Sequence, residues 1–280
     1  MKTSLSFAAI LFCGAAALAE DARSFDLKCA EGDKWVVSST RSLDFDLTVT
    51  DLENKKAGKQ VKAVVQEKYE REVQKLDGGH AAKVHLRWLE HRDASGQGDA
   101  LEGKDATLDS TGGNLDVKAT GVAEDVKSTL RIEEDFEAIL PGKPVAVGAT
   151  WQIDFREVAK FVLDQATIAP GAKGSGLCTF DSIEKTGDRE VAKVTISLSL
   201  SGATQPPDST VPGSPVPGWT MTAPLTGTLL YDLTHGRPVS LEFHGEVTAK
   251  GDELDTKKQP IATVEGRGLL SYVTSYEPSR

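Results

Sequence analysis

The side chains best suited to metal binding or acid–base catalysis are five histidines, and their spacing does not bring them together. Zinc and other transition metals take clusters of histidine and cysteine ligands at short, regular spacing. None of the five histidines belongs to such a cluster, and three of them fall in expected turns or strand ends. We therefore predict no metal site. The five are His80, His85, His91, His235 and His244.

Carboxylates and serines are abundant, but their arrangement does not favour catalysis. Glu133, Glu134 and Asp135 would point in different directions around a helix. No serine lies in a Gly-x-Ser-x-Gly turn, and Gly171–Gly176 lacks the Gly-Lys-Ser/Thr ending of a phosphate-binding loop. We predict a protein that is not an enzyme and needs no cofactor. An enzyme is the lower-ranked alternative, because two carboxylates on separate strands can converge only in the folded chain.

Three cysteines are present, and Cys13 lies in a segment that we expect to be removed on export. Cys29 and Cys178 remain. In an oxidising compartment two cysteines are interpreted first as one disulfide, which would tie the N-terminal segment to the second half of the chain. The alternative is two buried thiols that never meet.

The elements that must position any site are organised around a central segment, Phe136–Trp151. Before it, apolar side chains recur at roughly helical spacing, which predicts an amphipathic helix over about residues 122–140. Pro141 and Pro144 cannot continue that helix, because each lacks an N–H group and disfavours the helical conformation of its predecessor. From Val145 to Phe155 apolar residues alternate across a glycine, which predicts a strand with a turn or bulge.

The central segment also resembles a bacterial family. Within Phe136–Trp151 the chain follows the pattern Leu-Pro-x-Lys-Pro-Val-x-Val-Gly-x-x-Trp. This pattern is similar to the central motif of an exported family classed only as a domain of unknown function. The resemblance covers about sixteen residues closely and the flanking strands by pattern. It implies an exported, β-rich protein and carries over no catalytic residue.

Residues 1–19 have the composition of a secretory signal peptide. Lys2 precedes an apolar run that ends in small residues at Ala19, which predicts a mature N-terminus at Glu20. The phenylalanine before Cys13 is too large for the position that precedes an acylated cysteine, which argues against a lipoprotein. The apolar run is shorter than the ~20 residues that span a membrane. We therefore predict an exported protein, periplasmic or extracellular, with no transmembrane segment after cleavage.

The charge of the chain argues against nucleic-acid partners. The formal net charge is -10, and loss of Lys2 with the signal peptide makes it one charge more negative. An acidic surface repels phosphate backbones, and no basic run with interleaved aromatic residues opposes that repulsion. The partner is then expected to be a protein or an apolar ligand.

Strand patterns dominate the rest of the chain. Segments such as Leu43–Val49, Val194–Leu200 and Val239–Val247 alternate apolar and polar residues, which is typical of antiparallel sheet with one wet face. The predicted fold is mainly β with minor α: two similar antiparallel halves, curved or half-barrel in shape, with a central amphipathic helix. The halves are expected at residues 20–140 and 141–280.

An internal repeat supports the division into halves. Val73–Arg87 aligns without gaps on Ile183–Ser197 at a constant offset of 110, and both segments are interpreted as hairpins. Their turns are expected at Asp77-Gly78-Gly79 and Thr186-Gly187-Asp188. The sequence therefore indicates a duplication, with chance similarity of hairpins as the alternative.

A second pair of segments extends the repeat. Leu108–Gly113 resembles Tyr231–Gly236, but at the larger offset of 123. The Pro-rich insertion 205–218 accounts for the difference, and its five prolines are not expected to pair as a strand.

Two non-enzymatic functions fit these features. The first is a binding or scaffolding protein of the cell envelope, and the alternative is a carrier that holds a lipid or other apolar ligand. Trp219, beside the Pro-rich segment, is a candidate ligand or partner contact. Gly266 and Gly268 are further candidates, because glycines at inward positions leave room for a groove or permit close backbone approach. Large inward residues in the second half instead favour a filled core. These are Val194, Ile196, Leu198, Leu229, Tyr231, Val239, Leu241 and Phe243.

Overall fold

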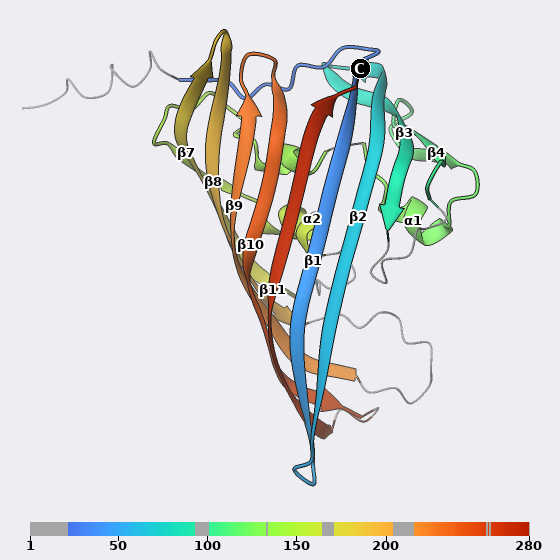
Figure 1. Ribbon diagram of the computed structural model, residues 1–280, viewed down its shortest axis with the longest axis vertical. Coiled ribbons are helices and arrows are strands. Elements are labelled where there is room, and N and C mark those ends of the chain that lie inside the picture. Colours follow the sequence, from blue (N-terminus) through green and yellow to red (C-terminus); the bar gives the residue numbers. More distant parts are fainter. Residues whose placement is uncertain are drawn as a thin grey trace, which may run out of the picture.

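A single antiparallel sheet of eleven strands forms most of the molecule (Figure 1). The computed structural model describes residues 22–92, 101–132, 134–163, 171–203, 216–255, 257 and 259–279. The sheet does not close into a barrel, and few helices accompany it. The predicted mainly β class with minor α is confirmed. The elements are β1 (Lys34–Asp51), β2 (Lys56–Asp77), β3 (His80–Arg92), β4 (Asp105–Asp109), β5 (Asp116–Ala119), α1 (Glu124–Thr129), η1 (Asp135–Ile139), β6 (Thr150–Ile153), α2 (Phe155–Val162), β7 (Lys173–Thr186), β8 (Arg189–Ala203), β9 (Val216–Asp232), β10 (Arg237–Leu254) and β11 (Pro260–Pro278).

The two halves of the chain are adjacent blocks of this one sheet. The strand order is β5-β4-β3-β2-β1-β11-β10-β9-β8-β7-β6, so strands that follow one another within a half are neighbours. The halves join where β1 pairs with β11, from Trp35 opposite Pro278 to Asp51 opposite Ala262. This long seam makes the two halves one continuous surface, which Figure 1 shows as the blue and dark red strands side by side.

Both predicted hairpins are present, with their turns at the expected residues. β2 and β3 turn through Gly78 and Gly79, and β7 and β8 turn through Gly187 and Asp188. From Ala82 to Trp88 on β3 the constant offset also preserves burial on β8, but it fails farther on, where Glu90 is exposed and Leu200 is buried. The offset does not preserve the pairing of strands across the turns. Val73 pairs with Val84, but the residues at the matching positions, Ile183 and Val194, do not pair with each other, because the partner of Val194 is Phe180. The duplication itself stays a prediction.

The central segment differs from the predicted helix over 122–140 and the strand from Val145 to Phe155. Instead of one helix there are two short pieces, α1 and the 3-10 turn η1, separated by residues with extended backbone at Leu130 and Glu134. The segment does end at Leu140, before Pro141. After a turn at Gly148, β6 is short, and Asp154 caps α2 by accepting from the backbone N–H of Arg156 at 2.9 Å.

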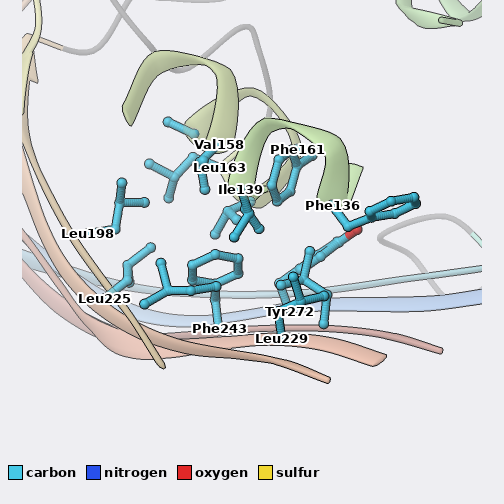
Figure 2. Close-up of a cluster of buried hydrophobic side chains, with 14 of the residues drawn as sticks. Phe136, Ile139, Val158, Phe161, Leu163, Leu198, Leu225, Leu229, Phe243 and Tyr272 are labelled. Carbon is cyan, nitrogen blue, oxygen red and sulfur yellow. The ribbon is translucent and has the colours of Figure 1, made fainter. Parts of the chain in front are cut away.

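The helices cover one face of the sheet, and the main core lies between that face and the helices. Figure 2 shows side chains of η1 and α2, including Ile139 and Val158, facing sheet residues such as Leu225 and Phe243. The large inward residues expected in the second half are buried there, with one exception. Val239 is only half-buried, because the β9–β10 register shifts between Pro238 and Ser240. A smaller second cluster lies between β3, β4 and the α1 region.

Parts of the predicted organisation fall outside the described residues. The signal peptide 1–19, with Cys13 and the start at Glu20, is one such part, and positions 205–215 of the Pro-rich insertion are another. The end of that insertion corrects the prediction, because Val216–Gly218 pair with β10. Among the described residues the pairing of β8 with β9 ends at Ala203 and Thr220, so Pro217 is not required to donate a hydrogen bond to β8. Within the described ranges, no helix is long and apolar enough to cross a membrane.

Candidate functional site

The candidate site is a cleft of about 310 Å³ between the helix-covered face of the sheet and the segment from α1 to α2. Strands β1, β2, β3 and β11 form its floor, and residues of α1, η1 and α2 form its roof. A volume of this size lies near the lower end of the range for small-molecule sites, roughly 300–1,000 Å³. The lining residues are Ser39, Arg41, Val65, Glu67, Tyr69, Leu86, Trp88, Leu101, Val126, Leu130, Arg131, Glu134, Asp135, Lys160, Phe161 and Tyr272.

One side of the cleft is apolar. Leu86 and Trp88, on β3, belong to the second hydrophobic cluster, against which Val126 and Leu130 pack from above. Strand alternation places them here, because the inward positions of β3 are its buried ones. This wall can exclude water from an apolar ligand.

The other side of the cleft is held by a buried ion pair. Arg71 Nε lies 2.6 Å from Glu134 Oε1, with the two side chains 3% and 8% exposed. Arg71 also donates from Nη2 to the Ile132 carbonyl oxygen at 2.8 Å and stacks over the Trp35 ring at 4.7 Å. Burial raises the pKa of Glu134, and Arg71 opposes that rise. The pair fixes the segment between α1 and η1 on the sheet.

A second polar contact closes the roof over β11. Asp135 accepts hydrogen bonds from Arg131 and from the Tyr272 hydroxyl. The Arg131 guanidinium also lies 5.6 Å from the centre of the Phe161 ring. Burial raises the pKa of Tyr272 to about 12, so this hydroxyl keeps its proton and donates at physiological pH.

Arg41 lies on the floor, between Val65 of β2 and Tyr272 of β11 in the strand register. Its Nη2 donates to the carbonyl oxygen of Phe161, in the last turn of α2, at 2.6 Å. This bond caps the helix and complements the negative end of its dipole. The Arg41 Nε atom is buried, and no hydrogen-bond partner for it is present in the described part of the chain.

These charged residues were not among the candidates predicted from the sequence, although a signal was present. Arg41 occupies the same inward phase of β1 as Val37 and Phe45, and Arg71 shares the inward phase of β2 with Val73. A charged side chain at an inward strand position needs a partner or a function. Their partners, Glu134 and Phe161, are brought near by the strand register together with the placement of η1 and α2 over the sheet.

The two cysteines do not form the predicted disulfide, and both are free thiols. Cys29 lies at the β2–β3 turn, where its Sγ is 3.8 Å from the Gly79 carbonyl oxygen. Cys178 is buried on β7, beneath the Ile139 carbonyl oxygen at 4.0 Å. The alternative prediction of two separate thiols is the one that the structure supports. Burial raises the pKa of Cys178 to about 12.

The glycine positions do not open a groove. A Cβ atom added at Gly266 would lie 2.6 Å from Phe45 Cζ, and one at Gly268 would lie 2.6 Å from Phe45 Cα. Beside Gly266 the Phe45 side chain takes the room that we expected to be open. Beside Gly268 the backbone of β1 lies close, which is the other arrangement expected of these glycines. Trp219 pairs through its backbone with Gly251, while its side chain lies outside the described part of the structure.

The histidines are dispersed, as their spacing indicates. Four of them contact a carboxylate among the described residues, and His80 begins β3 at an exposed position. Among the residues with described placement, no group of three or more His, Cys, Asp or Glu side chains is arranged to hold a metal ion. The four contacts are His85–Asp105, His91–Glu67, His235–Asp232 and His244–Glu242.

Comparisons with known proteins do not place the chain in a family. No protein-family model matches the sequence, and no curated protein sequence matches it. Among solved structures, a "putative lipoprotein" from Parabacteroides distasonis is 12% identical over 89% of this chain and 98% of that one, with a TM-score of 0.25. A LolA superfamily protein from Nitrosomonas europaea is 10% identical over 90% and 89%, with a TM-score of 0.18.

DynF, from the dynemicin biosynthesis pathway of Micromonospora chersina, is 10% identical over 97% of this chain and 91% of that one, with a TM-score of 0.17. TM-scores of this size carry no argument about ligand or function. The similarity of Phe136–Trp151 to an exported family of unknown function also stays a prediction.

Proposed function

We propose that this is an exported, non-enzymatic binding protein that carries a lipid or other apolar molecule in the cleft. The observation that carries this proposal is the apolar wall of Leu86, Trp88, Val126 and Leu130 in a cleft of about 310 Å³. In the main core, on the same face of the sheet, large side chains from the strands and from η1 and α2 are buried against one another. Export is supported by the signal-like residues 1–19.

The charged groups of the cleft suit binding better than turnover. Glu134 is held by Arg71, and Asp135 is held by Arg131 and Tyr272. Carboxylates committed to structural partners are poorly placed to exchange protons with a substrate. Their arrangement instead fixes the roof over the sheet, so that the apolar wall is preformed.

The test is ligand capture followed by blockage of the cleft. Mass spectrometry of organic extracts from purified protein should find a bound lipid, and a fluorescent fatty-acid probe should bind and be displaced by it. Val65→Trp places a large ring in the cleft and should weaken probe binding about tenfold or more. The matched control is Val64→Trp, because Val64 is 44% exposed on the opposite face of the same strand.

Two results would count against the proposal. If the wild-type protein yields no lipid and binds no probe, the carrier function is excluded. If Val64→Trp weakens binding as much as Val65→Trp, the probe binds elsewhere. If the carrier function is excluded, the envelope scaffold is the remaining non-enzymatic function expected from the sequence.

A further inference from the structure

We infer that the ligand of the cleft is an amphipathic anion whose oxyanion head pairs with Arg41. This inference rests on the proposed function and adds the chemical class of the ligand. It follows from the position of Arg41, from the pairing of the other charges, and from the unused donors of its guanidinium group.

The position of Arg41 suits a head group. Its strand neighbours at the same level are Val65 and Tyr272, which also line the cleft. Leu86 and Trp88 continue the floor on β3, beyond β2. A ligand with its apolar body along β3 would therefore bring its head to β1, where Arg41 lies.

The other charges that line the cleft already have partners. Lys160 binds Glu157 at 2.6 Å, and Arg131 binds Asp135. The carboxylate of Glu67 lies 3.2 Å from His91 Nε2. Among the described residues, Arg41 is the lining cation for which no ion pair with a carboxylate is present, so its charge is available to an anionic ligand.

The guanidinium group of Arg41 has donors to spare. It carries five N–H groups, and the described residues take one of them, through the bond to Phe161. Its Nε is buried and finds no acceptor among the residues that the structure describes, which is costly for a charged group unless an acceptor is supplied from elsewhere. A planar fork of donors matches the paired oxygens of a carboxylate or phosphate. An oxyanion head would supply the missing acceptors.

The experiment compares ligands that differ only in their heads. Titration calorimetry would measure dodecanoate, dodecyl phosphate and dodecanol on the full mature protein. We expect both anions to bind at least about tenfold more tightly than the alcohol, because a hydrogen bond to a charged group contributes that much or more. The ratio of dodecanoate to dodecyl phosphate then distinguishes a carboxylate head from a phosphate head.

Variants assign the preference to Arg41. Arg41→Gln should lose the preference for anions and keep its affinity for dodecanol, whereas Arg41→Lys should keep part of it. The matched control is Arg267→Gln on β11, where Arg267 Nε donates to Glu246 at 2.6 Å at an exposed position. This change should leave the preference intact. If Arg41→Gln fails to fold, the Lys variant and the salt dependence of wild-type binding still test the inference.

The outcomes separate the two proposals. If the wild-type protein binds anions and alcohol equally, or if Arg41→Gln keeps the preference, the inference about the head is overturned and the carrier function survives. If the affinity for anions does not fall as salt rises, the inference is overturned as well. If no ligand of the three binds and no lipid is extracted, both proposals fail.

Discussion

Arg71 and Glu134 form an ion pair that connects β2 to the segment between α1 and η1, two parts of the chain that the sequence alone does not bring together. Both side chains are almost fully buried, so the pair is shielded from solvent. A buried pair gains little over an apolar one, but the loss of one partner leaves a charge without compensation. The contact therefore acts mainly by fixing where the roof of the cleft lies.

The first prediction concerns the loss of one partner. Arg71→Met leaves the Glu134 carboxylate buried without the cation that pairs with it, and should lower the free energy of unfolding by about 3–5 kcal/mol at pH 7. The double variant Arg71→Met/Glu134→Gln should recover about half of that loss, since the bond to Ile132 stays missing. Urea denaturation measures all three proteins. A double variant no more stable than Arg71→Met would contradict a coupled pair.

The second prediction concerns pH. Burial raises the pKa of Glu134 in the folded protein above its value of about 4.3 in the unfolded chain. The folded state therefore keeps the proton on Glu134 to higher pH than the unfolded chain does. The contribution of this group to the free energy of unfolding is complete below about pH 4 and is lost as pH rises through the pKa of the folded state. Glu134→Gln lacks this titration. Urea denaturation at a series of pH values measures the free energy of unfolding of both proteins. The value for the wild type minus that for Glu134→Gln should fall as pH rises above 4, and a difference that grows with pH would refute this.

The third prediction concerns the two thiols. Without reductant, iodoacetamide in denaturant should alkylate both Cys29 and Cys178, because they are not bonded to each other. In the native protein at pH 8, Cys178 should not react, since a pKa of about 12 leaves almost no thiolate. Cys29 is half-buried and should react slowly. Peptide mapping locates the label, and absence of alkylation in denaturant would indicate a disulfide.

The β class and the hairpin turns were predictable because a strand repeats every two residues. Val194 and Ile196 are buried where alternation places them, and glycines at Gly78 and Gly187 take the positive φ that their turns require. The pattern failed in the central segment. Trp151, Ile153 and Phe155 alternate, but Asp154 is also a helix cap, and it begins α2 at Phe155.

The site was not predictable in the same way. Arg41 and Arg71 stand at inward strand positions, which marks them as unusual but does not say what they face. Their partners, Phe161 and Glu134, are 120 and 63 residues away along the chain, and only the register of the sheet and the placement of the helices bring them close. The glycines were found from the sequence, but it could not show that Phe45 fills the space beside them.

The last prediction tests that packing. A Cβ at Gly266 would lie 2.6 Å from Phe45 Cζ, so Gly266→Ala should lower the free energy of unfolding by about 1–3 kcal/mol. The control is Gly58→Ala on β2, where no atom lies within 4 Å of the added Cβ, and it should be neutral or slightly stabilising. Adding Phe45→Leu should cost less in the Gly266→Ala background than in wild type, because the shorter side chain relieves the clash. Additive losses in chemical denaturation would instead mean that Phe45 does not pack on Gly266.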